Sequence, residues 1–263
     1  MQLGISTASL FVRYTTEDAL RYISENKVRS AEIFLSTYCE YNKKFGKILN
    51  ANKGGVDIHS IHVLNTQFEP QLYSAGVRAK ADAFKMLKSV MACGKEIGAK
   101  YYTFHGVARV KRTPLKMDFE RIGNITQEIM DTTKRYGITL TYENVHWAYY
   151  NYIGFFKAVK ERVPELKGAL DIKQARQSGI HYKEFLDEMG KDIVTVHLSD
   201  VDENGKMCLP GKGVTDFEDL FLRLRDVGFD GSMLIEVYQN DYNEPKELID
   251  SLEFLKEKAD KVF

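Results

Sequence analysis

Short apolar stretches alternate with amphipathic stretches along the whole chain. Eight runs are rich in apolar and β-branched residues, and apolar residues recur at helical spacing between them, which predicts alternating strands and helices. The predicted strands lie within residues 3–7, 30–36, 57–65, 100–106, 138–145, 168–175, 193–200 and 231–238. The clearest predicted helices are 15–27, 74–98, 117–137, 215–231 and 244–262.

Two of the predicted helices open with a capping-box pattern. Thr15 is followed by Asp18, and Thr215 by Glu218, so that side-chain oxygens can accept free backbone N–H groups of the first helical turn. The sequence therefore predicts that these helices begin at positions 15 and 215.

The alternation repeats about every 33 residues, which requires a parallel sheet because each helix returns the chain to the same edge. Eight such units match a (β/α)8 barrel. An open doubly wound sheet is the alternative, but it favours a glycine-rich phosphate fingerprint after the first strand, and residues 3–11 (LGISTASLF) contain none. No low-complexity linker divides the chain, so we expect residues 1–263 to form a single (β/α)8 TIM barrel domain.

Composition and charge narrow the classes of partner. The 37 basic and 37 acidic residues balance, so no overall positive field attracts nucleic acid or an anionic membrane. No basic leader precedes an apolar segment, and no window approaches a membrane-spanning length. The three cysteines lack CxxC spacing and give no disulfide framework or thiolate zinc site. We expect a cytoplasmic protein without nucleic-acid or membrane partners.

The last four predicted strands each finish with a group that binds protons or metals: Glu143, Asp171, His197 and Glu236. The carboxyl ends of barrel strands surround one cavity, so these side chains are expected to converge. Three carboxylates in one place repel each other, and a bound divalent cation relieves the repulsion. Three oxygen ligands and one nitrogen suit Mn2+, Mg2+, Co2+ or Zn2+. The alternative is that each carboxylate only caps the following helix.

The sequence resembles the xylose-isomerase-like barrels, which include sugar and sugar-phosphate isomerases, ketose 3-epimerases, inosose dehydratases and zinc-dependent apurinic endonucleases. The resemblance is carried by TYEN around Glu143, ALDIKQ around Asp171, VHLSD with the later LPGKG, and GFDGSMLIEVY around Glu236. It implies that Glu143, Asp171, His197 and Glu236 bind one divalent metal ion. It also implies substrate contacts from histidines at other strand ends, here His62 and His105.

The chain departs from the family pattern at several positions. Gln174 stands where many relatives have the histidine of Asp-x-x-His, and the loop 200–213 contains no histidine, so a trinuclear endonuclease site lacks ligands. Asp200 replaces the arginine that ketose 3-epimerases usually place after the histidine of the seventh strand. Lys206 and Lys212 in that loop could bind a phosphate or could be exposed charges.

Lys173 and Gln174 are the remaining candidates for substrate contact. If residues 168–175 continue as a strand, Lys173 points inward with Asp171. The alternative is that the chain has already turned into a loop and leaves this lysine in solvent.

These observations predict a divalent-metal-dependent isomerase or epimerase of a small sugar, polyol or sugar phosphate. Glu143 and Glu236 would exchange a proton with the substrate through an enediolate, while Asp171 and His197 mainly hold the ion. An inosose-type dehydratase is the nearest alternative, followed by a nuclease and a non-catalytic sugar-binding barrel. The expected partner is a small carbohydrate, and a homo-oligomer is compatible with the sequence.

Overall fold

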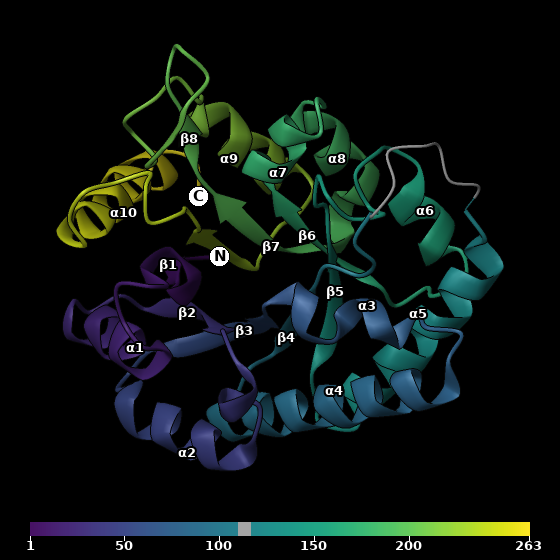
Figure 1. The fold of residues 1–263 in the computed structure, drawn as a ribbon. Coiled ribbons are helices and arrows are strands. Elements are labelled where there is room, and N and C mark those ends of the chain that lie inside the picture. Colours follow the sequence, from purple (N-terminus) through teal and green to yellow (C-terminus); the bar gives the residue numbers. More distant parts are fainter. Residues whose placement is uncertain (110–116) are drawn as a thin grey trace.

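A computed structural model, which describes residues 1–109 and 117–263, has eight parallel strands closed into a barrel (Figure 1). The strands are β1 (Gln2–Ser6), β2 (Ser30–Leu35), β3 (Asp57–Val63), β4 (Tyr101–Phe104), β5 (Thr139–Glu143), β6 (Lys167–Asp171), β7 (Ile193–Leu198) and β10 (Ser232–Ile235). Each pairs with its neighbours in chain order, and β1 pairs with both β2 and β10 to close the cylinder. The predicted (β/α)8 TIM barrel is confirmed.

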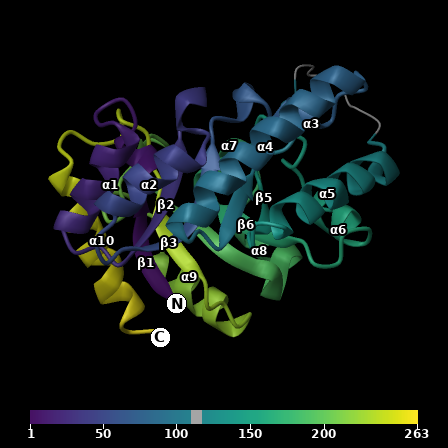
Figure 2. The ribbon, with the colours of Figure 1, turned by 90° about the horizontal axis from the view of Figure 1, so that it is seen from below.

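Helices surround the barrel on the outside, as the view from below shows (Figure 2). They are α1 (Thr16–Glu25), α2 (Lys43–Asn52), α3 (Glu69–Leu72), α4 (Val77–Ile97), α5 (Phe119–Lys134), α6 (Phe155–Lys160), α7 (Ile172–Gln177), α8 (Tyr182–Met189), α9 (Phe217–Asp226) and α10 (Lys246–Ala259). Within the part of the chain that the structure describes, no helix combines the length and apolar character needed to cross a membrane. That the whole chain is one domain stays a prediction.

The barrel strands are buried on both faces, which explains why they are nearly continuous apolar runs. Their outward side chains pack under the helices, whereas the interior holds polar pairs that join strands across the barrel. His59 on β3 bonds Thr195 on β7 at 2.9 Å, and Ser30 on β2 bonds Ser232 on β10 at 2.9 Å. These pairs satisfy polar groups inside the barrel, below the charged groups at its mouth.

The sixth predicted strand is too long. β6 ends at Asp171, and helix α7 begins at the next residue. Asp171 is itself the N-cap, because its side chain accepts the backbone N–H of Gln174 at 2.9 Å. Residues 172–175 are therefore helical, and their side chains do not alternate between the two faces of the barrel wall as they would in a strand.

One predicted helix start is right and the other is wrong. Thr15 caps α1 by accepting the N–H of Asp18, as the capping-box pattern predicts. Helix α9 is capped by Asp216 instead of Thr215, and Glu218 takes no part in the cap. The backbone N–H of Thr215 bonds a carboxylate in the preceding loop, which keeps Thr215 outside the helix.

Candidate metal centre and active site

Four side chains from consecutive barrel strands meet at the carboxyl ends of the strands. Nδ1 of His197 lies 3.0 Å from Glu143 Oε1, 3.1 Å from Glu236 Oε2 and 3.9 Å from Asp171 Oδ2. Ligand atoms of Glu143, Asp171 and His197 all lie within 4.8 Å of one another. The structure therefore brings together the four residues predicted as metal ligands.

Two carboxylate oxygens in this cluster are left free among the described residues. Asp171 uses Oδ1 to cap α7, but its buried Oδ2 accepts no hydrogen bond. Glu236 Oε2 also accepts none, because the Nδ1 hydrogen of His197 is directed to Glu143. Helix capping thus accounts for one oxygen of Asp171 and leaves the other unsatisfied. Buried carboxylate oxygens without donors are suited to a cation.

The protonation of the cluster follows from its burial and its charges. Burial raises the pKa of Asp171 to about 7. Burial alone would lower the pKa of His197, but Glu236, Glu32 and Glu143 raise it well above its ordinary value. Without a cation, protons on His197 and Asp171 therefore offset the nearby negative charge.

A cavity of about 540 Å3 opens onto this cluster and contains most of the predicted substrate contacts. His62, His105 and Gln174 line it together with Glu143 and Glu236. The rest of the wall is largely apolar and includes Phe11, Phe34, Leu64, Trp147 and Tyr238. A mostly apolar pocket with a few convergent polar groups is typical of small-molecule sites.

Gln174 and Trp147 are held at the cavity wall by neighbouring histidines. The ring Nδ1 of His146 lies 2.6 Å from Gln174 Oε1, and the backbone N–H of His146 donates to the same oxygen. The rings of Trp147 and His105 are 5.7 Å apart. These contacts fix the amide and the indole beside the cluster.

Lys173 lies in helix α7 and is completely buried, so its interpretation as a solvated loop residue is wrong. Its Nζ is 3.7 Å from Asp171 Oδ2 and 3.9 Å from Glu236 Oε1, and it lies 4.3 Å from the centre of the Tyr238 ring. It is not among the described residues that line the cavity. Because α7 begins directly after Asp171, the ammonium group of Lys173 packs against the carboxylates of Asp171 and Glu236.

Glu32 is a buried carboxylate that the sequence analysis missed. It accepts hydrogen bonds from Ser6 (3.1 Å), Ser60 (2.7 Å) and Thr103 (2.7 Å), on three other strands. Its Oε1 is also 3.0 Å from Nε2 of His197, although this N–H is not well aligned on the oxygen. The sequence did contain a signal for this role: a glutamate lies within a predicted buried strand, and glutamates are seldom buried without partners.

Glu69 is the second missed carboxylate. It accepts hydrogen bonds from Tyr102 (2.5 Å), Asn65 (2.9 Å) and Nδ1 of His105 (3.0 Å). Nε2 of His105 then faces Glu143 Oε2 at 3.3 Å. Glu69 opens α3 just after a short 3-10 turn (Asn65–Gln67) and carries no local signal of this role.

The loop after β7 is organised by Asp200. Its carboxylate accepts backbone N–H groups from four residues of the loop, namely Val201, Gly211, Gly213 and Thr215. The loop also contains a short hairpin of β8 (Asp200–Val201) and β9 (Met207–Cys208). Lys206 and Lys212 are exposed, and they line neither the cavity beside Glu143 and Glu236 nor a second cavity beside α7 and α8. Asp200 thus has a structural role in place of the arginine expected from the family pattern.

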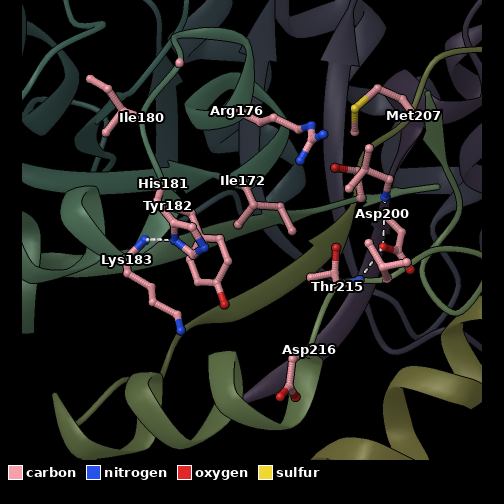
Figure 3. A pocket seen from close by; sticks show the side chains of 14 residues that line it. Ile172, Arg176, Ile180, His181, Tyr182, Lys183, Asp200, Met207, Thr215 and Asp216 are labelled. Carbon is pink, nitrogen blue, oxygen red and sulfur yellow. Dashed lines mark hydrogen bonds between the residues drawn. The ribbon is translucent and has the colours of Figure 1, made fainter. Parts of the chain in front are cut away.

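A second cavity, of about 470 Å3, lies beside α7, α8 and the loop after β7 (Figure 3). Arg176, His181, Lys183, Met207 and Asp216 line it, and the Arg176 guanidinium points into it. It contains none of the predicted ligands or substrate contacts. We therefore place the candidate active site in the first cavity.

A closed parallel barrel with carboxylates and a histidine converging at the carboxyl ends of its strands defines a TIM barrel with a candidate metal site. The chain belongs to the xylose isomerase-like TIM barrel family, whose sequence profile matches residues 14–258.

Three solved structures illustrate the shared fold. A D-tagatose 3-epimerase-like protein is 19% identical with a TM-score of 0.77, covering 100% of this chain and 98% of that chain. The IOLI protein with a bound zinc atom is 15% identical with a TM-score of 0.79, and the match covers 100% of this chain and 99% of that chain. The D-psicose 3-epimerase of Clostridium cellulolyticum H10 with D-tagatose is 15% identical with a TM-score of 0.76, covering 100% and 99%. At these identities the likeness shows the shared fold. Comparison with curated proteins gives no match.

Proposed function

We propose that the protein is a divalent-metal-dependent isomerase or epimerase of a small sugar, polyol or sugar phosphate. The observation that carries the proposal is that Glu143, Asp171 and Glu236 each place a carboxylate oxygen within 3.9 Å of Nδ1 of His197, beside the cavity that Glu143 and Glu236 line. The family supports it, as do same-fold structures described as a 3-epimerase with D-tagatose and a protein with bound zinc.

The residues present fit a divalent cation. Asp171 Oδ2 and Glu236 Oε2 are buried oxygens without donors in the described chain, and Nδ1 of His197 lies between the carboxylates. Glu143, Asp171, His197 and Glu236 would hold the ion, and their oxygen-rich set is compatible with Mn2+, Mg2+, Co2+ or Zn2+. When bound, the ion supplies positive charge beside a substrate carbonyl oxygen, which makes the neighbouring C–H more acidic.

Glu143 and Glu236 are the proposed proton-transfer pair. Both line the cavity, and they come from opposite sides of His197, since β6 and β7 separate β5 from β10. One carboxylate can remove a proton from one face of the substrate while the other returns a proton to the opposite face. Glu143 Oε2 is the atom directed away from His197 and toward His105, so it is the oxygen that we assign to proton transfer.

His62, His105 and Gln174 are the proposed substrate contacts. Both ring nitrogens of His62 are buried without a hydrogen-bond partner in the described chain, so they are available to a substrate hydroxyl. His105 is oriented by its bond to Glu69, with Nε2 facing the cavity side. Trp147 offers an aromatic face against the apolar side of a sugar ring.

The test is solvent deuterium exchange with a panel of ketoses, inososes and their phosphates, in the presence of Mn2+, Co2+ or Zn2+. We expect deuterium at one carbon of the true substrate, detected by NMR and mass spectrometry. A product that differs from the substrate formula only by deuterium in place of hydrogen identifies an isomerase or epimerase. Loss of one water identifies the alternative dehydratase, which begins with the same proton abstraction.

The matched variants are Glu236→Ala in the site and Glu203→Ala in the exposed loop. Glu236→Ala should abolish exchange and weaken metal retention, while Glu203→Ala should leave both unchanged. The proposal is contradicted if the wild-type protein retains no divalent ion and added ions neither bind nor change its thermal stability.

A further inference from the structure

Lys173 is a buried cation on the far side of the proposed metal ligands. Its side chain has 0% exposure, and its Nζ lies 3.7 Å from Asp171 Oδ2 and 3.9 Å from Glu236 Oε1. The backbone carbonyl of Glu236 is 3.5 Å away, and the Tyr238 ring covers the ammonium group at 4.3 Å. The lysine therefore contacts two ligands and is shielded from the cavity.

The charges of the proposed centre do not balance without this lysine. Glu143, Asp171 and Glu236 together carry three negative charges, and a divalent ion supplies two positive charges. One negative charge then remains in a buried site, where unpaired charge is strongly unfavourable. Lys173 supplies the missing positive charge. The further carboxylate, Glu32, lies on the other side of His197, where hydrogen bonds from three hydroxyl groups stabilise its charge.

We propose that Lys173 is a positioning residue that serves as the fixed counter-ion of the metal centre and acts through Asp171 and Glu236. The inference rests on the proposed function, because it presumes a divalent ion between the four ligands. A neutral centre accepts the negative charge that develops on the substrate oxygen more readily than a negative centre does. This role differs from the substrate contact predicted for Lys173 from the sequence.

The counter-ion role gives effects of opposite sign on metal binding and on turnover. Lys173 would repel a divalent ion held by Asp171 and Glu236, because its Nζ lies within 3.9 Å of an oxygen of each. Removing its charge should tighten metal binding, whereas it should slow turnover because the centre becomes negative. The metal-free protein should become less stable, because Asp171 and Glu236 lose their nearest buried cation.

The experiment compares Lys173→Met with a matched control, Lys167→Met. Lys167 also pairs with a carboxylate, Asp192 at 2.9 Å, but outside the site. The Mn2+ dissociation constant is measured by chelator competition at pH 8.5, where carboxyl protonation interferes least. We expect Lys173→Met to bind Mn2+ about tenfold more tightly or better, with lower kcat and little change in KM. Lys167→Met should match the wild type in all three quantities.

Equal or weaker Mn2+ binding by Lys173→Met would overturn the inference, and so would a rise in KM without a change in metal affinity. Lys173→Arg keeps the charge and should retain wild-type affinity; tighter binding by this variant would show that charge is not the cause. If Lys173→Met does not fold, Lys173→Gln repeats the comparison. If the wild-type protein binds no Mn2+, Co2+ or Zn2+, the proposed function itself is refuted. That outcome differs from a wild-type protein that binds metal while Lys173→Met fails to bind it more tightly, which refutes only the role of Lys173.

Discussion

Glu32 Oε1 lies 3.0 Å from Nε2 of His197, on the edge of the ring opposite to the Nδ1 atom that faces the proposed metal ligands. Outer carboxylates of this kind orient a metal-binding histidine and make its other nitrogen a stronger ligand. Both oxygens of Glu32 already accept hydroxyl groups, so Glu32 is suited to this supporting role more than to direct coordination.

Glu32→Gln should therefore weaken the affinity for a divalent ion by roughly 10-fold to 100-fold, because the carboxamide keeps the shape but removes the negative charge behind His197. Isothermal titration calorimetry with Mn2+ or Zn2+ measures the change. Glu40→Gln is the control, since Glu40 is also buried and hydrogen-bonded but lies away from His197. Equal affinities of the two variants would rule out the supporting role.

The number of protons released when a divalent ion binds should depend on pH. His197, whose pKa is raised well above its ordinary value by neighbouring carboxylates, should lose its Nδ1 proton across the neutral range. Asp171, whose pKa burial raises to about 7, should lose a second proton only below that pH. We expect about two protons released per ion at pH 6 and about one at pH 8. Calorimetry in buffers of different ionisation enthalpy counts them, and a constant number across this range would contradict the assignment.

His59 should make the fold sensitive to acid. Burial lowers its pKa to about 4, while the unfolded chain takes up the proton near pH 6.5. Between these values the unfolded state binds more protons, so the stability present above pH 6.5 is lost as the pH falls toward 4. The loss from this group is roughly 2 to 3 kcal/mol at pH 4.5.

His59→Gln should remove that part of the acid sensitivity, since an amide can still bond Thr195 and does not titrate. Urea unfolding of the variant and the wild type at pH 7.5, 5.5 and 4.5 measures it. The exposed His181→Asn, which retains a helix-capping side chain, is the control. Parallel stability curves for His59→Gln and the wild type would contradict the expectation.

Arg13 should stabilise the cavity mouth. Its guanidinium donates to the backbone carbonyls of Gln239, Tyr242 and Asn243 and lies 4.4 Å from the centre of the Tyr242 ring. It thereby joins the loop after β1 to the loop that follows Glu236. Arg13→Met should lower the free energy of unfolding by about 1 to 2 kcal/mol and reduce kcat/KM for the identified substrate.

Arg29→Met is the control for that loss, because Arg29 is exposed and precedes β2 at the other end of the barrel. Denaturant unfolding and steady-state kinetics check both variants. An Arg13 variant that is no less stable than the Arg29 variant would show that the two loops do not depend on this contact.

The sequence by itself determined the alternation of strands and helices, and with it the barrel. It also determined which residues stand at the ends of β5, β6, β7 and β10, since the position of a side chain along a strand is local information. Glu143, Asp171, His197 and Glu236 could be named for that reason. The Thr15 cap was predictable on the same ground, whereas the α9 cap was not, because a tertiary bond from Asp200 holds Thr215 in the loop.

Only the tertiary structure decided the surroundings of those four residues. Glu32 on β2 contacts His197 on β7, and Glu69 at the start of α3 contacts His105, which follows β4. Lys173 became a buried neighbour of Asp171 and Glu236 because α7 begins directly after β6 and Tyr238 covers it. Such contacts depend on which strands become neighbours when the cylinder closes, and no local periodicity of the chain encodes that choice.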